Sequence, residues 1–219
     1  MNSPILQLLV LAGIAVFLIL RLKNVLGTRE GYEKPPAPPT SAPRSDRRDF
    51  EVIEGGPDRD IVDHVPEGSE TAKALAQMKK AEPSFGVADF LSGARGAYEM
   101  ILMAFERGKI DEIEPFLSQD VYDSFAEVVA AREAQGLIIE AEFVGVRETK
   151  LVEATYEEDT GHAEITVRFT GELTQVVKDA EGQVVEGSAT QVKRQRDVWT
   201  FARRMGSDDP NWQLVATGE

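Results

Sequence analysis

The spacing of hydrophobic positions changes several times along this chain of 219 residues. Residues 4–20 are uninterrupted by charge, and residues 27–68 carry few large apolar side chains. Apolar positions then recur at the helical period between 84 and 135, and at a period of two after Gly136. These patterns predict a membrane segment, a linker, a group of helices and a sheet, in that order.

The first segment predicts an uncleaved membrane anchor at Pro4–Leu26. Its uncharged run is followed by Arg21 and Lys23, and no A-x-A cleavage pattern follows it. A cleaved signal peptide carries its basic residues before the apolar run instead. Basic residues that flank a span favour the cytoplasmic side. We therefore expect a single span with the N-terminus outside and the rest of the chain in the cytoplasm.

Residues 27–83 are expected to form a proline-rich linker that carries one short helix near 69–82. The run from Pro35 to Pro39 favours extended polyproline geometry. Ser69 is a suitable helix cap, and Pro83 ends the alanine-rich pattern that follows it. The folded domain is then expected at 84–219.

The helical period predicts helices at 89–107, 109–117 and 119–135. Asp89 is a plausible N-cap of the first, and Gly108 and Gly136 are stop signals. The first helix carries a long apolar stripe that must face a core. Its members are Phe90, Leu91, Ala94, Ala97, Tyr98, Ile101, Leu102 and Phe105.

After Gly136 the alternation of apolar and polar residues predicts strands. They are expected at 137–147, 149–157, 162–170, 172–178, 188–204 and 211–217. In the third, apolar residues alternate with polar ones from Ala163 to Thr170, which is typical of a half-buried antiparallel strand. Helices followed by an antiparallel meander indicate an α+β fold in which a curved sheet packs on long helices.

Composition excludes several kinds of chemistry. The chain has no cysteine, so disulfides, thiolate metal sites and cysteine nucleophiles are absent. Residues 1–80 carry balanced charges, whereas residues 81–219 hold the whole net charge of −14. An acidic domain repels phosphates, so we expect no nucleic-acid partner. No motif for a metal or a cofactor occurs, and we expect neither.

Asp197 is the one carboxylate whose position suggests chemistry. It shares strand parity with Trp199 and Phe201, so the three side chains should face the same side. An acid on an apolar concave face can act as a general base, as in ketosteroid-isomerase-like cones. The alternative is a structural role, either through pairing with an arginine such as Arg168 or Arg196 or through capping of local backbone.

A curved sheet over helices often leaves an apolar pocket. The aromatic residues of this chain either fill the core or, in a subset, line such a pocket. The residues that we select as candidates for ligand or partner binding are Tyr98, Phe105, Phe125, Val129, Phe169, Asp197, Trp199 and Phe201.

Three sets of residues together resemble the Tim44-like domain family over about 84–217. The first set runs from Phe90 to Gly108, and the second joins Val121, Tyr122 and Phe125 to Arg132 and Gly136. The third set joins Asp197-Val-Trp-Thr-Phe-Ala-Arg203 to Asp209-Pro-Asn-Trp-Gln-Leu214.

This resemblance implies a fold similar to the nuclear-transport-factor-two or cystatin-like fold, with a large apolar pocket. It also implies a non-enzymatic adaptor at an inner membrane, and the anchor-linker-domain layout is similar to that of bacterial members. The expected function is thus a single-pass adaptor of the bacterial inner membrane, acting in protein translocation or membrane-protein biogenesis. Its partner would be a chaperone, a translocase or a ribosomal protein. The alternatives are an enzyme that uses Asp197, or a ribosome-associated membrane receptor.

Overall fold

The computed structural model describes residues 57–218, and every structural statement below refers to this part of the chain. The anchor predicted at Pro4–Leu26 and most of the predicted linker lie outside the described residues. Between residues 57 and 218, no helix is both long enough and apolar enough to span a bilayer.

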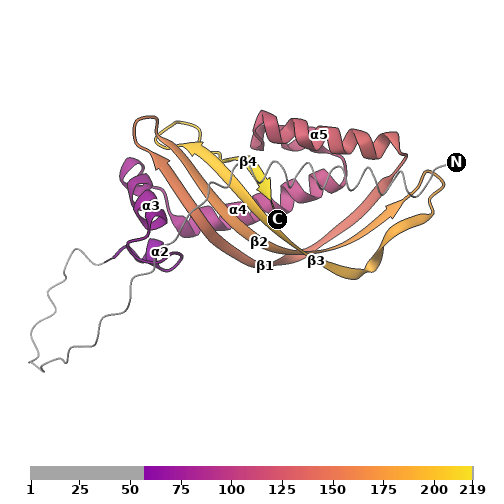
Figure 1. Ribbon diagram of the computed structural model, residues 1–219, viewed down its shortest axis with the longest axis horizontal. Helices are drawn as coiled ribbons and strands as arrows, with labels where there is room; N and C mark the ends of the chain where they lie inside the picture. The colour runs from indigo at the N-terminus through magenta and orange to yellow at the C-terminus, as the bar shows by residue number, and fades with distance from the viewer. Residues whose placement is uncertain (1–56, 219) are drawn as a thin grey trace, which may run out of the picture. The chain divides into compact units, whose positions relative to one another are not determined.

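Helices precede strands along the chain, so the α+β order expected from the sequence is confirmed (Figure 1). The helices are α2 (Arg59–Val62), α3 (Glu70–Ala81), α4 (Val87–Glu106), the 3₁₀ helix η1 (Ile110–Phe116) and α5 (Gln119–Ala134). The strands are β1 (Ile138–Glu157), β2 (His162–Lys178), β3 (Val184–Arg204) and β4 (Gln213–Gly218).

The strands form one antiparallel sheet in the order β1-β2-β3-β4. The expectation of six strands is wrong, because the four segments predicted between 137 and 178 join into two long strands. The β1–β2 register shifts at three places, the first between Phe143 and Gly145. Such bulges bend a strand without ending it. The sheet consequently curves around α4, which lies along its concave face (Figure 1).

The two faces of β2 differ as its alternating sequence predicts. Side chains on the concave face are fully buried, and those on the opposite face are polar and mostly half-exposed. The buried set is Ala163, Ile165, Val167 and Phe169. These residues join the apolar stripe of α4 in one core, which fixes the sheet against the helix.

The N-terminus of α4 is capped by a residue from a different helix. Asp60 of α2 accepts hydrogen bonds from the backbone N–H of Val87 at 2.7 Å and of Ala88 at 2.9 Å. Lys79 of α3 donates to the same carboxylate at 2.8 Å. The expectation that Asp89 caps this helix is therefore wrong, because Asp60 supplies the oxygens that the free N–H groups need.

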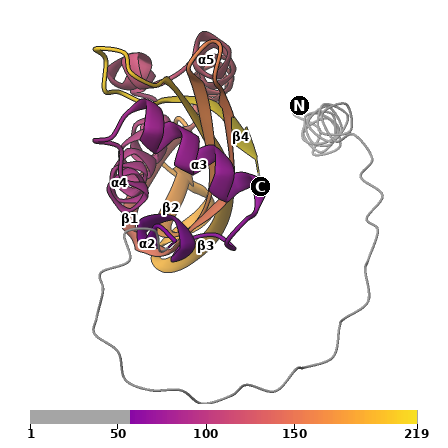
Figure 2. The same cartoon turned by 90° about the vertical axis from the view of Figure 1, so that its left-hand side faces the viewer.

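The core extends upstream of residue 84, where the sequence suggested that the domain begins. Leu75 and Met78 of α3 are fully buried, and Ile61 of α2 is 4% exposed. All three belong to the same core cluster as the sheet. Helix α3, which confirms the helix predicted at 69–82, packs against β1, and α2 packs against α3 (Figure 2).

The connection from β3 to β4 contains Asp209 to Trp212, which belong to the third set of residues that resembles the family. Arg203 donates to the carbonyl of Pro210 at 3.1 Å and also to the carboxylate of Glu82 at the end of α3. Its guanidinium lies 5.4 Å from the ring centre of Trp212, which in turn packs 4.8 Å from Phe90. These residues therefore fasten the β3–β4 connection to the helices.

Candidate functional site

The centre of the concave face is filled by an aromatic cluster around Tyr98. Tyr98 of α4 is fully buried, and its ring stacks on Phe169 of β2 with centroids 4.5 Å apart. The ring of Trp199 on β3 lies 4.8 Å from it at a tilt. Close aromatic packing of this kind contributes to stability beyond the buried area alone. This part of the face is core rather than an open apolar pocket.

The hydroxyl of the buried tyrosine is hydrogen-bonded to Asp197. Tyr98 Oη donates to Asp197 Oδ2 at 2.5 Å, and Gln195 Nε2 donates to the same oxygen at 2.9 Å. Asp197 pairs with Phe169 on β2, and Trp199 pairs with Val167. Because Phe169 and Val167 lie on the same buried face of β2, the expectation that Asp197 shares a face with Trp199 is confirmed. Asp197 is thus hydrogen-bonded to a tyrosine and a glutamine, and not to either of the arginines that the sequence suggested.

The position of this hydroxyl is set by the strand beside it. A β-carbon built on Gly171 would lie 2.5 Å from Tyr98 Oη, so only glycine leaves room for the phenol. Burial raises the pKa of Tyr98, and the adjacent Asp197 carboxylate raises it further. Tyr98 therefore stays protonated and donates its hydrogen bond across the accessible pH range.

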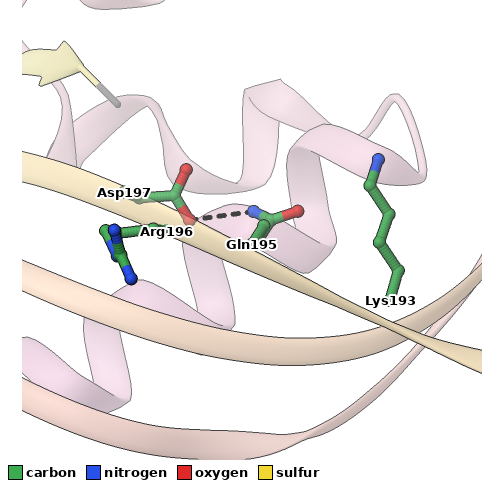
Figure 3. Close-up of a pocket in the computed structure, with 4 residues that line it drawn as sticks. All are labelled: Lys193, Gln195, Arg196 and Asp197. Atoms are coloured by element: carbon green, nitrogen blue, oxygen red, sulfur yellow. Dashed lines mark hydrogen bonds between the residues drawn. The ribbon is translucent and has the colours of Figure 1, made fainter.

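An open pocket of about 470 Å³ begins where this cluster reaches the surface. Its lining comes from one stretch of β3: Lys193, Gln195, Arg196 and Asp197. Figure 3 shows Lys193 and Asp197 on the side of the strand that faces the helices, with Arg196 on the other side. The pocket thus follows the edge of β3 and carries charged groups on both sides of the strand.

Of the four pocket residues, Lys193 and Gln195 were not considered from the sequence, and Arg196 was considered only as an ion-pair partner of Asp197. Lys193 and Gln195 share the strand parity of Asp197, so alternation alone places them on the same face. The run Lys193-Arg-Gln-Arg196 is also basic within an acidic domain. These two signals together single out this stretch of β3 in the sequence.

A second group of candidates joins α4 to α5. The rings of Phe105 and Phe125 lie 4.5 Å apart, and the Arg132 guanidinium lies 4.5 Å from the centre of Phe105. Burial lowers the pKa of Arg132, while the charge of Glu106 opposes that change. Val129 on the same helix is 7% exposed. This group holds the two helices together and leaves both phenylalanines partly accessible.

The predicted site residues thus separate into three environments. Tyr98, Phe169, Trp199 and Phe201 are core residues, each at most 4% exposed. Phe105, Phe125 and Val129 lie at the α4–α5 contact, and Asp197 alone lines the pocket. Whether any of them binds a ligand or a partner stays a prediction. Over residues 57–218, no cluster of three or more His, Asp or Glu side chains could hold a metal ion.

Comparison with known families identifies the class to which this fold belongs. The model of the Tim44-like domain family matches residues 71–219, so the chain belongs to that family. The resemblance drawn from the sequence motifs is confirmed.

Two relatives from different organisms, both named TIM44, match part of this chain. The mitochondrial import inner membrane translocase subunits TIM44 of Homo sapiens and of Rattus norvegicus are 23% and 22% identical to this chain over 159 residues. Each alignment covers 71% of this chain but 35% of the relative, so the chain matches about a third of those proteins.

Among solved structures, the intermembrane space region of the chloroplast protein ARC6 matches with a TM-score of 0.39 and 14% identity. That alignment covers 60% of this chain and 92% of the other.

Proposed function

We propose that this chain is a membrane-anchored adaptor that acts in protein translocation or membrane-protein biogenesis. Residues Pro4–Leu26 would supply the single span in a bacterial inner membrane, with the Tim44-like domain in the cytoplasm. The observation that carries the proposal is the family membership over residues 71–219. The human and rat relatives are both named as subunits of a mitochondrial inner-membrane translocase. We extend to this chain a role at a membrane in protein transport.

The site supports binding rather than catalysis. Asp197, the candidate general base, accepts two hydrogen bonds at one oxygen and satisfies the hydroxyl of a fully buried tyrosine. A buried hydroxyl needs such a partner, which gives Asp197 a structural role. The core around it is filled by aromatic rings, so a small apolar substrate would have to displace packed side chains.

The partner is proposed to bind at the rim of the domain. The buried aromatic candidates are not accessible, whereas Asp197 and its neighbours on β3 line an open pocket. The acidic charge of the domain favours a protein over a nucleic acid. A chaperone, a translocase subunit and a ribosomal protein are all consistent with this placement.

Affinity purification tests the proposal. A tagged full chain would be expressed in a bacterium, crosslinked in cells and purified from solubilised membranes. We expect one or more partners to be recovered with the full chain and lost when residues 57–219 are deleted. A second variant, in which residues 1–26 are exchanged for an unrelated single span, should retain the same partners.

The outcomes separate the alternatives. Ribosomal proteins in the eluate would favour the ribosome-associated receptor over a translocase adaptor. Membrane flotation of the full chain, lost on deletion of residues 1–26, would support the anchor. If no protein depends on residues 57–219 for recovery, the adaptor function is wrong.

A further inference from the structure

Strand β3 has an open edge over much of its length. It pairs with β2 from Val184 to Arg204, but β4 covers it only from Val198 to Ala202. Within the described part of the chain, no strand lies beside residues 184–197 on the side away from β2. Alternate residues of an antiparallel strand direct their N–H and C=O groups away from the paired neighbour. This edge can therefore accept another strand.

A bulge limits where a new strand can pair. Lys193 is paired with Leu173, and the next pair joins Ser188 to Gln175, so residues 189–192 have no partners on β2. The hydroxyl of Ser188 accepts hydrogen bonds from the backbone N–H of Thr190 and of Gln191, each at 3.3 Å. These two N–H groups are therefore already paired within the bulge. The bulge separates the open residues 184–188 from residues 193–197, which form the open edge directly beyond the end of β4.

The charge at this edge is opposite to that of the domain. Residues 193–196 read Lys-Arg-Gln-Arg, whereas residues 81–219 carry the net charge of −14. Arg194 pairs with Glu172 at 3.0 Å. Lys193 and Arg196 form no ion pair with any described residue, and both line the open pocket. Two unpaired cations thus flank the free backbone, one on each side of the strand.

Building on the adaptor function proposed above, we infer that the partner presents an extended acidic segment that adds to the sheet beside residues 193–197. Main-chain hydrogen bonds to the open edge supply affinity, and carboxylates of the segment pair with Lys193 and Arg196. The added strand lies in line with β4. The occupant of the pocket is then an extended strand that carries negative charge.

Two other occupants fit the edge less well. If two copies of this chain paired along residues 193–197, Lys193 and Arg196 would lie near the same basic residues of the other copy. Like charges across a pair of strands are destabilising. An anionic lipid headgroup could neutralise the cations, but it offers no run of N–H and C=O groups to match the open backbone.

The experiment measures binding of a labelled peptide to the full chain in nanodiscs of neutral phosphatidylcholine. The peptide TEEVTEEV presents pairs of glutamates, so that carboxylates occur on both sides of an added strand. Two control peptides keep its length: one has lysine in place of glutamate, and one is N-methylated at alternate backbone nitrogens on its pairing side. N-methylation removes backbone donors without changing charge.

We expect the acidic peptide to bind, and the N-methylated and lysine peptides to bind about ten-fold more weakly or not at all. The K193E/R196E variant should weaken binding of the acidic peptide about ten-fold. The K80E/K150E variant changes the net charge equally at exposed residues of α3 and β1, and should leave affinity within about two-fold. Amide hydrogens at 193–197 should exchange more slowly in the complex.

Several results would overturn the inference. Equal binding of the N-methylated peptide would show that charge alone acts, and equal losses in both charge-reversal variants would show that the edge is not the site. Tighter binding to nanodiscs that contain anionic lipid, in competition with the peptide, would assign the edge to a membrane surface. If the chain forms concentration-dependent dimers that K193E/R196E abolishes, the open edge binds a second copy. If the acidic peptide does not bind at all, the inference is wrong.

Failure here is distinguishable from failure of the adaptor function. Partners that depend on residues 57–219 but persist in K193E/R196E would leave the adaptor standing and exclude the edge. A peptide that binds at residues 193–197, with no such partner in cells, would support the edge as a binding site and exclude the adaptor function.

Discussion

The phenolic oxygen of Tyr98 occupies the space that a side chain at Gly171 would need. A β-carbon there would lie 2.5 Å from the oxygen, which is closer than van der Waals contact allows, and a tight 3.0 Å from Tyr98 Cε1. The helix α4 and the strand β2 therefore meet with no spare volume at this point. The hydrogen bond from Tyr98 to Asp197 depends on that close approach.

The first prediction concerns this contact. Gly171→Ala should lower the free energy of unfolding by about 1–3 kcal/mol, because the packed tyrosine has to move. Adding Tyr98→Phe removes the oxygen that clashes, so the double variant should lose less than the sum of the two single variants. Urea unfolding of the four proteins checks this. Additive losses would mean that the two residues are not coupled.

The second prediction concerns Asp197. Asp197→Ala leaves the buried Tyr98 hydroxyl without its acceptor and should destabilise the domain by about 1–3 kcal/mol. Asp197→Asn keeps an acceptor oxygen in place and should cost less than Asp197→Ala. Thermal unfolding followed by circular dichroism measures both. If the alanine variant is as stable as the native chain, the carboxylate is not needed for the fold and its catalytic use deserves testing again.

The third prediction is a pH dependence that arises at Asp60. Partial burial acts to raise the pKa of this acid, but the bonds from Lys79 and from the backbone N–H of Ala88 and Val87 hold it at about 2, against an ordinary 3.8. The ionised form is thus favoured in the folded state. Its contribution, about 2 kcal/mol, is complete above pH 4 and is lost as the pH falls toward 2.

Unfolding free energies measured between pH 7 and pH 2.5 would test this dependence. Asp60→Asn should be less stable than the native chain at pH 7, and the difference should shrink as the pH falls. A constant difference over that range would show that the charge of Asp60 does not contribute.

The fourth prediction concerns Arg203. Its side chain is 8% exposed and pairs with Glu82, which is 22% exposed. Arg203→Met would leave that carboxylate with fewer donors in a poorly hydrated place and should cost about 3 kcal/mol. Arg204→Met, one residue further along and exposed, should change stability by less than about 0.5 kcal/mol. Similar effects of the two changes in urea unfolding would contradict the assignment.

The fifth prediction is a gain in stability within α4. Gly93 and Gly96 are exposed helix residues, and a β-carbon at either would meet nothing within 4 Å. Alanine at each position should therefore stabilise the domain by about 0.5–1 kcal/mol. Melting temperatures of Gly93→Ala and Gly96→Ala check this. A loss of stability in either variant would indicate a contact that the structure does not contain.

Local patterns in the sequence predicted α3, α4, η1 and α5, because their apolar stripes and stop signals lie within one element, but they missed α2, which lies within the predicted linker. They did not predict that Asp60 caps α4, since that contact joins residues 27 positions apart. They also divided β1 at Glu148, where a bulge lets the strand continue. They divided β2 at Gly171, although that residue pairs regularly with Gln195 of β3. Asp197 was found by its strand parity, but its partner Tyr98 is 99 positions away, and charge alone suggested an arginine.

The cap on α4 also leads to an expectation about how the domain responds to tension. Asp60 joins α2 to Lys79 of α3 and to the first backbone N–H groups of α4. A pull along the polypeptide from the direction of its N-terminus therefore loads these hydrogen bonds before it reaches the sheet. Under load from that side, we expect α2 to detach and to free the end of α4 before the ring contacts of Tyr98 with Phe169 and Trp199 are lost.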